Sequence, residues 1–556
     1  MYIKLQHKIW FFNLVLVLWG SLTAMGQTLN KQEKVTFTTG RGKTKVTTNE
    51  EGQLIVNVSP KAAQRIQSNG VVRYPDFGAE GDGKTDDIDA IAAAHAYANL
   101  HHLPVKAADN ATYYISGKDR TAIIQTQTDF GTAQFIINDT HVQNRNAPVF
   151  KVQSGLQPFR IDGISSLRRN QEKIDIALPG PCLVAVTDDN KMRFIRLGRN
   201  QNGGHPQTDI FMVDNKGNVN TDTPIIWDFD QISNLIAIPI DSSILRITGG
   251  YFTTIANKAD SKYTYYSRGI AIGRSNVIVD GVRHYVVGEG DHGAPYGGFI
   301  SIRDCANVTV RNAVFTGHKV YETIGSSGLP VDMGSYDISL SRSLYVSFIN
   351  CSQTNDINDV AYWGIMHSDY CKNIVFDKCT LSRFDAHMGV ANTTIRNSTL
   401  GHQGINIIGR GILTVENTTI HRGTFVNLRG DYGSTWEGEF HVRNCVLKPV
   451  DSTKSNVSLI SGSNSGQHDF GYSCYMPERI IIENLYIDDS NHSADYQGPA
   501  IFGNFNPKLT DETYKSSFCY HVPREVILNN VTTASGKPLR LCDNMFMFRN
   551  VNIIYQ

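Results

Sequence analysis

The sequence predicts an all-β chain folded as a right-handed parallel β-helix, with an N-terminal capping helix and an inserted antiparallel β segment. Two observations lead to this prediction. A short β-branched run that ends in asparagine or a substitute recurs through the C-terminal half, and its shorter steps are close to the ~20 residues of one solenoid coil. A glycine-rich segment that leads into an alanine-rich helix stands before these repeats, where a solenoid needs a cap.

The charge balance excludes two classes of partner. The chain has 556 residues, with 52 basic and 52 acidic side chains and a formal net charge of zero. A dedicated nucleic-acid-binding protein or a polybasic membrane-surface protein carries an excess of Lys and Arg. We therefore expect no nucleic acid partner and no membrane insertion.

The first 26 residues are typical of a signal peptide. Lys4 and Lys8 precede an apolar run over 9–20, and small residues lead to Gly26. The run is shorter than the ~20 apolar residues that a membrane-spanning helix needs. We expect an exported protein, periplasmic or secreted, whose N-terminal segment covers 27–70.

Residues 71–179 are expected to hold the cap and the first coils. Thr85 and Asp86 are the expected caps of a helix over 88–100, because their side chains can accept hydrogen bonds from free backbone amides. The loop 78–85 also fits the Gly-x-x-x-x-Gly-Lys-Thr pattern of a phosphate-binding loop. Glu80 and Asp82 would repel phosphates there. We expect this loop to support the fold and to bind no nucleotide.

The residues from Asp76 to Asp87, Asp-Phe-Gly-Ala-Glu-Gly-Asp-Gly-Lys-Thr-Asp-Asp, resemble the opening motif of the pectate-lyase-like β-helix superfamily. Members of that superfamily include polysaccharide lyases, glycoside hydrolases, epimerases and phage tailspikes, so the resemblance implies an architecture and leaves the chemistry open. The chain is also similar to carbohydrate-active β-helix proteins of Bacteroidota polysaccharide-degradation loci, including ulvan oligosaccharide dehydratases. That similarity implies an anionic substrate, ulvan-like or pectin-like.

Residues 180–245 break the rhythm of the repeats. Two apolar runs, 193–197 and 209–213, precede a turn at 215–218. Such runs beside a tight turn predict antiparallel hairpins inserted into or beside the solenoid.

Residues 246–556 are expected to form the catalytic part of the β-helix. The repeat is marked at Asn312, Asn350, Lys378, Asn397, Asn417, Asn444, Asn484, Asn530 and Asn550. We interpret these asparagines, and the sequon-like Asn392, as turn residues that accept left-handed backbone and hydrogen-bond along a stack. Cys351, Cys379 and Cys445 each follow a marker, which predicts a stacked core column and not disulfides.

The candidate site lies in 353–437. Arg383, Asp385 and His387 are spaced at i, i+2 and i+4, so they share one face of an extended strand. Further candidates lie in the neighbouring coils: Trp363, His367, His402, Asn406, Asn427, Arg429 and Tyr432.

These residue types favour β-elimination at a uronic acid, which needs a positive group for the carboxylate, a base and an acid. In this scheme Arg429 or Arg383 binds the carboxylate, and His387, oriented by Asp385, takes the proton. Tyr432 or His402 then serves the leaving oxygen, while Asn406, Asn427, Trp363 and His367 bind substrate.

Loss of the next sugar gives chain cleavage, and loss of a terminal hydroxyl gives dehydration. Two alternatives stay open, a β-helix glycoside hydrolase and a non-catalytic carbohydrate-binding solenoid. The region lacks the adjacent Asp-Asp doublet of polygalacturonase-like hydrolases. We expect a monomer that acts on an anionic carbohydrate, with no metal site and no required cofactor, although Ca²⁺ is compatible with the sequence.

Overall fold

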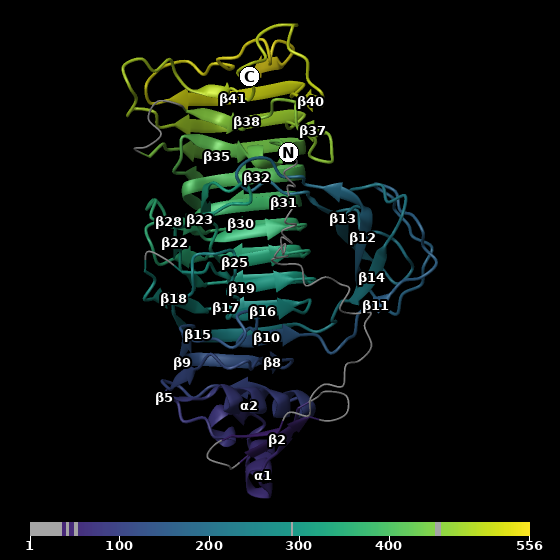
Figure 1. Cartoon of the computed structure of the whole chain (residues 1–556), viewed down its shortest axis with the longest axis vertical. Coiled ribbons are helices and arrows are strands. Elements are labelled where there is room, and N and C mark those ends of the chain that lie inside the picture. The colour runs from purple at the N-terminus through teal and green to yellow at the C-terminus, as the bar shows by residue number, and fades with distance from the viewer. Residues whose placement is uncertain (1–35, 40–43, 49–53, 291–292, 451–456) are drawn as a thin grey trace, which may run out of the picture.

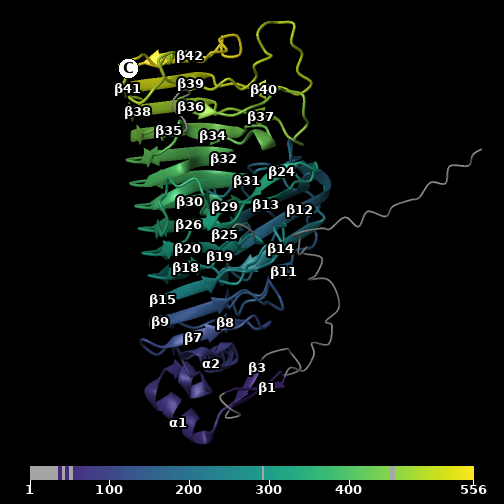
Figure 2. The same ribbon diagram turned by 60° about the vertical axis from the view of Figure 1, so that its left-hand side comes forward.

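The computed structural model describes residues 36–39, 44–48, 54–290, 293–450 and 457–556. The predicted signal peptide, 1–26, lies outside the described residues. The described chain forms a tall column of stacked strands, with helices at its N-terminal end and an antiparallel sheet on one flank (Figure 1). The turned view in Figure 2 shows the same stacking from a second side. The predicted parallel β-helix is therefore confirmed.

The N-terminal end is closed by a small sheet and two helices. The sheet contains β1 (Thr36–Thr39), β2 (Thr44–Thr48) and β3 (Leu54–Asn57), followed by α1 (Pro60–Asn69). Helix α2 (Ile88–His101) lies at the end of the column (Figure 1), and residues on most of its circumference are buried. The predicted capping helix is confirmed, and its burial protects the first coil from solvent.

The loop before α2 uses its own carboxylates to bind its backbone amides. Asp82 accepts hydrogen bonds from the amides of Lys84 and Thr85 at 2.9 and 2.7 Å, and Asp87 accepts from Glu80 and Gly81. These amides are therefore occupied, which agrees with the expected structural role. The prediction of Thr85 as a helix cap is wrong, because Thr85 lies within strand β5 and the N-cap residue is Asp87. Asp86 also lies in β5, but its side chain accepts a hydrogen bond from the amide of Ile88 at 3.4 Å.

The strands of the column pair in parallel. The first coils contain β4 (Val72–Arg73), β5 (Asp82–Asp86), β6 (Val105–Lys106), β7 (Thr112–Ile115), β8 (Ala122–Ile124), β9 (Thr128–Asn138) and β10 (Phe150–Gln153). The following coils contain β15 (Leu245–Ile255), β16 (Ile270–Gly273), β17 (Val277–Asp280), β18 (Arg283–Val287), β19 (Gly297–Arg303), β20 (Ala306–Arg311), β21 (Val314–Phe315), β25 (Tyr336–Ser341), β26 (Leu344–Ile349), β27 (Ser352–Gln353), β29 (Met366–Asp369) and β30 (Lys372–Asp377).

The last coils contain β31 (Thr380–Arg396), β32 (Thr399–Glu416), β33 (Thr419–Ile420), β34 (Thr424–Leu428), β35 (Trp436–Leu447), β36 (Ser458–Ser461), β38 (Arg479–Ile487), β39 (Ala500–Phe502), β41 (Glu525–Thr533) and β42 (Asn552–Tyr555). Short pairs decorate the column: β22 (His318–Lys319) with β28 (Tyr362–Gly364), β23 (Tyr321–Ile324) with β24 (Pro330–Met333), and β37 (Cys474–Tyr475) with β40 (Tyr520–His521).

The marker asparagines form a ladder along the column. Thr394 pairs with Thr414 in parallel register, as the repeat predicts. Asn417 donates its side-chain amide to Asn397 at 3.1 Å, and Asn444 donates to Asn417 at 3.3 Å. These three asparagines have φ between 47° and 53°, so the left-handed turn is observed at each. The ladder satisfies polar groups that successive turns leave exposed.

The predicted cysteine column is also present. Cys351, Cys379 and Cys445 are buried and free, and their thiols donate to backbone carbonyls of neighbouring coils. All nine cysteines lie among the described residues and are free. The core therefore takes its stability from packed coils and not from disulfides.

An antiparallel sheet is inserted between β10 and β15. Its strands are β11 (Phe159–Arg160), β12 (Cys182–Arg193), β13 (His205–Val213) and β14 (Asn234–Pro239), in the order β11-β14-β12-β13. The antiparallel insertion is therefore confirmed, and it includes β11, upstream of the predicted range 180–245. A buried ion pair joins it to the column, with Lys372 Nζ 2.8 Å from Asp209 Oδ1.

Candidate functional site

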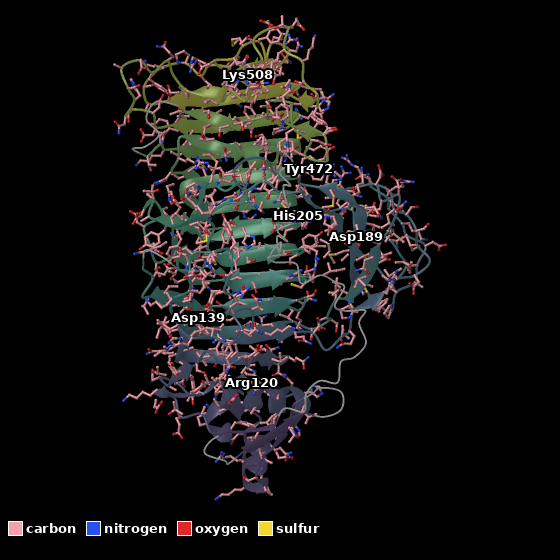
Figure 3. The ribbon with its side chains drawn as sticks, in the orientation of Figure 1. Arg120, Asp139, Asp189, His205, Tyr472 and Lys508 are labelled. Carbon is pink, nitrogen blue, oxygen red and sulfur yellow. The ribbon has the colours of Figure 1, made fainter. Side chains whose placement is uncertain are left out.

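The candidate site lies on the face of β29, β31 and β34 that the insertion approaches. In β31, Phe384 and Ala386 point into the core and are 0% exposed. Arg383, Asp385 and His387 alternate with them and share the opposite face, as their spacing predicts. Figure 3 labels His205 of the insertion and Tyr472 of a C-terminal loop, which lie along the seam between column and insertion.

Two histidines share one aspartate at the centre of the site. His387 Nδ1 lies 3.0 Å from Asp369 Oδ1, and His367 Nδ1 lies 3.7 Å from Asp369 Oδ2. The expectation that Asp385 orients His387 is therefore wrong. Asp369 holds the ring, because β29 is the neighbouring coil and its outward residues lie beside those of β31.

Asp385 holds two arginines instead. Its carboxylate lies 2.8 Å from Arg383 and 3.2 Å from Arg429 and is 0% exposed. Arg429 also forms an ion pair with Asp431 at 2.8 Å, and Asp431 forms another with Arg196 of the insertion, also at 2.8 Å. This chain of charges connects the column to the insertion. A buried carboxylate of this kind needs such partners, since an unpaired charge is costly away from water.

Tyr432 closes one side of the site. It lies in a short 3₁₀ turn, Gly430–Tyr432, and is 1% exposed. Its hydroxyl lies 3.4 Å from His387 Nε2, and the guanidinium groups of Arg196 and Arg429 lie 5.4 and 5.6 Å from its ring centre. The tyrosine therefore packs between the histidine and the two arginines. We call His367, Asp369, Arg383, Asp385, His387, Arg429, Asp431, Tyr432 and Arg196 the histidine–arginine cluster.

The remaining predicted residues lie around this cluster. Trp363 lies 5.4 Å from the Arg383 guanidinium, in a cation–π contact. Asn406 and Asn427 hydrogen-bond to each other at 2.9 Å, as part of the stacking between coils. His402 contacts the carbonyl of Ile357 at 3.0 Å, in a different loop. The structure thus brings Trp363 to the cluster and leaves His402 directed elsewhere.

Electrostatics sets the protonation of the cluster. Burial would raise the pKa of Asp369, but His387 and His367 hold it well below its usual range. Burial is likewise outweighed at Asp385 by Arg383 and Arg429, and at Asp431 by Arg429, so the pKa of each of these carboxyls is lowered. All three aspartates are therefore ionised at neutral pH.

His387 behaves differently. Burial, together with the charge of Arg429, lowers the pKa of His387 below its usual value. The ring is therefore neutral at pH 7 and can accept a proton. Burial raises the pKa of Tyr432, so its hydroxyl keeps its proton. The cluster thus pairs a neutral imidazole with ionised carboxylates and arginines.

Accessibility divides the cluster into two parts. The side chains of His367, Asp369 and His387 are 19%, 19% and 21% exposed, and Arg196 is 23% exposed. Arg383 is 5% exposed. The histidines and Arg196 can therefore meet a ligand, while Arg383 and Asp385 support them from behind.

Sequence reasoning missed Asp369 and Arg196 as site residues. Asp369 stands two positions after His367, so the alternation along β29 was a usable signal for it. Arg196 lies in the loop after β12, far from the repeats in sequence, and no periodicity points to it. Its contribution depends on how the insertion folds back onto the column.

Neither a metal nor a membrane span is indicated by the described part of the chain. No group of three or more His, Cys, Asp or Glu side chains in it could hold a metal ion. None of its helices is long and apolar enough to cross a bilayer.

The architecture is that of parallel β-helix proteins, and comparisons with known proteins agree with this. No family model matches the chain. A tailspike of an Acinetobacter baumannii bacteriophage, solved with a capsular saccharide, has a TM-score of 0.51 at 10% identity, over 91% of this chain and 81% of that one. A Pseudomonas phage phi297 tailspike has a TM-score of 0.49 at 11% identity, over 83% and 80%. At 10% identity, the likeness to the Acinetobacter phage tailspike shows the fold alone.

One curated protein has local sequence similarity. A capsule-specific depolymerase of a Klebsiella phage is 27% identical over 117 residues, which are 17% of this chain and 11% of the depolymerase. The match thus spans about a tenth of that relative's length. These similarities support the β-helix part of the predicted resemblance and lend no support to the link with Bacteroidota or ulvan.

Proposed function

We propose that the chain is an exported carbohydrate-active carbon–oxygen lyase. Its substrate is an anionic polysaccharide or oligosaccharide, ulvan-like or pectin-like, and its reaction is β-elimination at a uronic acid. The observation that carries this proposal is the pair of histidines on Asp369, at 3.0 and 3.7 Å, beside Arg196 and Arg429. A β-helix fold shared with a saccharide-bound tailspike, and local similarity to a depolymerase, support a carbohydrate ligand.

The reaction follows from the accessible side chains. Arg196, with Arg429 behind it, neutralises the uronate carboxylate, which acidifies the neighbouring ring proton. The His387 imidazole takes that C5 proton, the electron pair forms a double bond between C4 and C5, and the C4–O bond breaks. The leaving oxygen receives a proton from His367, which is more accessible than Tyr432 and shares the Asp369 carboxylate. Tyr432 then positions the His387 ring.

The protonation of the cluster argues against the hydrolase alternative at this site. A glycoside hydrolase needs one carboxyl that stays protonated to act as the acid. The three aspartates of the cluster all have lowered pKa values. A protonated carboxyl is therefore unavailable among them, whereas histidines suit elimination at neutral pH.

Absorbance and mass together test the proposal. The protein is incubated with uronate-containing oligosaccharides from pectin and ulvan and with capsular polysaccharide, and double-bond absorbance is followed beside mass spectrometry. Absorbance with shortened chains indicates a lyase, and absorbance with loss of one water indicates a dehydratase. Shortened chains without absorbance would replace the proposal by hydrolysis, and unchanged saccharides would leave a binding protein.

A substitution at His387 locates the chemistry. We expect His387→Ala to lower turnover by roughly a hundredfold or more, as the loss of a general base does. Asp377→Asn is the matched control, because Asp377 lies at the end of strand β30, pairs with Arg396 of β31 and is outside the cluster. Full activity of His387→Ala would move the site elsewhere. Export and a monomeric state are part of the proposal, and cell fractionation and light scattering test them.

A further inference from the structure

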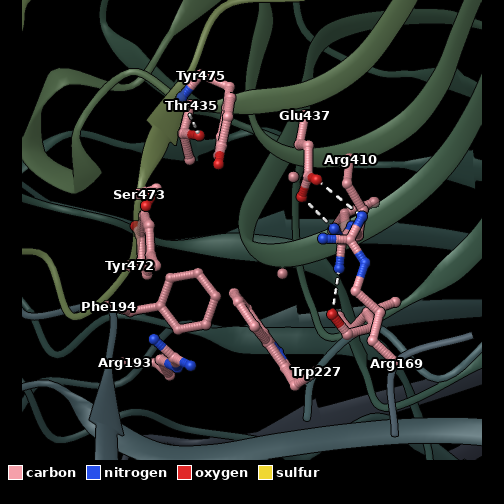
Figure 4. A pocket seen from close by; sticks show the side chains of 14 residues that line it. Arg169, Arg193, Phe194, Trp227, Arg410, Thr435, Glu437, Tyr472, Ser473 and Tyr475 are labelled. Carbon is pink, nitrogen blue, oxygen red and sulfur yellow. Dashed lines mark hydrogen bonds and ion pairs between the residues drawn. The ribbon is translucent and has the colours of Figure 1, made fainter. Parts of the chain in front are cut away.

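A hollow lies between the insertion and the column, beside the histidine–arginine cluster. It has a volume of about 240 Å³. Its walls come from three segments that are far apart in sequence: the insertion, the corners of the coils around β31, β32 and β35, and the loop at 472–475. Figure 4 shows this pocket, which does not include His387 or Asp369. The mechanism proposed above leaves it without a role.

Arginines dominate the charge of the pocket. Three arginines line it and Glu437 is the one carboxylate among the lining residues. Arg169 lies 2.7 Å from Glu437, which also pairs with Arg410. Arg193 instead donates to the neutral Gln207 side chain at 2.9 Å and to the Gly471 carbonyl. The lining therefore carries two more positive than negative charges.

The burial of Arg193 and Arg410 is incompletely compensated. Burial lowers the pKa of Arg193 and, despite Glu437, that of Arg410. A guanidinium in this state is stabilised by a further anion that enters its surroundings. A planar carboxylate or a sulfate fits the forked donors of arginine.

Aromatic side chains form the other part of the wall. Trp227 packs against Arg193, whose guanidinium lies 4.5 Å from its ring centre. Tyr472 lies 6.3 Å from Trp227 and 5.1 Å from Phe194. In Figure 4 these rings lie to one side of the hollow and the ion pair of Glu437 with Arg410 lies across from Phe194 and Tyr472. Such rings present apolar surface to a flat ligand face.

We propose that this pocket binds one acidic sugar unit of a saccharide, with its ring against Trp227 and Tyr472 and its carboxylate or sulfate on the arginines. The volume is below the roughly 300–1,000 Å³ of sites for drug-sized ligands, which suits a small unit. The choice of a sugar as ligand rests on the function proposed above, whereas the preference for an anion rests on the arginines alone.

The position of the pocket beside the histidines suits the anchoring of a saccharide. Gly389 lines the pocket and follows His387 by two residues on β31. Phe194 of the pocket lining and Tyr432 of the histidine–arginine cluster pack in one apolar group with Tyr370 and Met388. The pocket and the cluster are therefore neighbours that share packed side chains. A saccharide anchored by one acidic unit in the pocket would present an adjacent part of the chain to the histidines.

Binding measurements with matched arginine variants test the pocket. The probes are tetragalacturonate, an ulvan-derived tetrasaccharide and methyl-esterified tetragalacturonate as the uncharged counterpart, in calorimetry with the full-length protein. Arg169→Gln is the test variant because its side chain is 44% exposed, so the fold tolerates the change. Arg168→Gln is the control, because Arg168 is exposed, pairs with Asp230 and does not line the pocket.

We expect at least one acidic tetrasaccharide to bind and the uncharged ester to bind far more weakly. Arg169→Gln should weaken binding about tenfold or more, as loss of a charged contact does, and Trp227→Leu should weaken it as well. Arg168→Gln should bind like the wild type. The proposal is overturned if Arg169→Gln and Trp227→Leu both bind as tightly as the wild type, or if none of the acidic probes binds.

The outcome separates this proposal from the proposed function. If double bonds form in the substrate but Arg169→Gln keeps its KM, the pocket proposal fails alone. If acidic probes bind through Arg169 but no double bond forms, the pocket stands and the lyase proposal fails. His387→Ala should retain binding while losing turnover, because His387 lies outside the pocket.

Discussion

Replacing Asp369 by asparagine removes the charge that holds both histidines while keeping the size of the side chain. The carboxylate lies 3.0 Å from His387 Nδ1, and Asp369 is 19% exposed. A hydrogen bond to a charged group contributes about 1.5–3 kcal/mol, and each 1.36 kcal/mol changes a rate about tenfold. We therefore expect turnover to fall roughly 10- to 150-fold, because the imidazole loses its fixed orientation.

The pH dependence distinguishes this role from a structural one. Asp369 raises the pKa of His387, whereas burial and Arg429 lower it. Loss of the negative charge should therefore lower the pKa of His387 further and move the acidic limb of the pH–rate profile to lower pH. The assay measures the initial rate of double-bond formation between pH 4 and 9, with an oligosaccharide on which the wild type is active.

Asp377→Asn is the control for this experiment, and thermal unfolding verifies that both variants are folded. Asp377 is also an aspartate, lies on strand β30 and pairs with Arg396 of strand β31 at 3.0 Å. Its substitution should change neither turnover nor the pH profile. Wild-type turnover in Asp369→Asn with an unmoved acidic limb would refute the assignment of His387 as the base.

Substitutions at four other residues give further expectations. Arg429→Gln should raise the pKa of His387 and shift the acidic limb to higher pH, whereas Arg429→Lys should leave the limb in place. Lys84→Ala should leave activity nearly intact, and neither the wild type nor this variant should bind ATP. Lys372→Met should destabilise the fold by about 3–5 kcal/mol in urea unfolding, because it leaves buried Asp209 unpaired. The pKa of His318 is raised to about 10, against burial, by Glu289 and Asp337, so stability present below about pH 6.5 should be lost towards pH 10, and His318→Gln should remove this slope.

Each of these expectations has a contrary result. An acidic limb unmoved by Arg429→Gln would separate that charge from His387. Measurable ATP binding that Lys84→Ala abolishes would restore a phosphate-binding loop. Lys216→Met, at an exposed turn, is the control for Lys372→Met and should change stability by less than about 0.5 kcal/mol. Equal slopes in His318→Gln and wild type would assign the alkaline loss of stability to other groups.

The sequence was informative wherever one coil follows another. Marker asparagines predicted the register that places Thr394 beside Thr414, because each coil repeats the same turn. The alternation in β31 predicted that Arg383, Asp385 and His387 share a face. These features depend on local periodicity, which survives in the order of the residues.

The contacts between residues of the histidine–arginine cluster could not be predicted from the sequence. Asp385 is two positions from His387, so the sequence predicted that its carboxylate orients the His387 ring. Two residues at this spacing along one strand are ~7 Å apart, however. Adjacent coils bring outward side chains closer than that, so Asp369 takes the role from β29. A gap of 18 residues in the chain says nothing of this contact unless the register is known.

The sequence by itself determined the solenoid, its cap and the strand face that carries the polar residues, since these follow from repeated local patterns. Only the tertiary structure decided that Arg196 joins the cluster and that Arg169, Arg193 and Arg410 surround one pocket. The reason is physical. The insertion docks on the column through the buried pair of Lys372 and Asp209, and such long-range contacts form between residues whose separation along the chain carries no periodic signal.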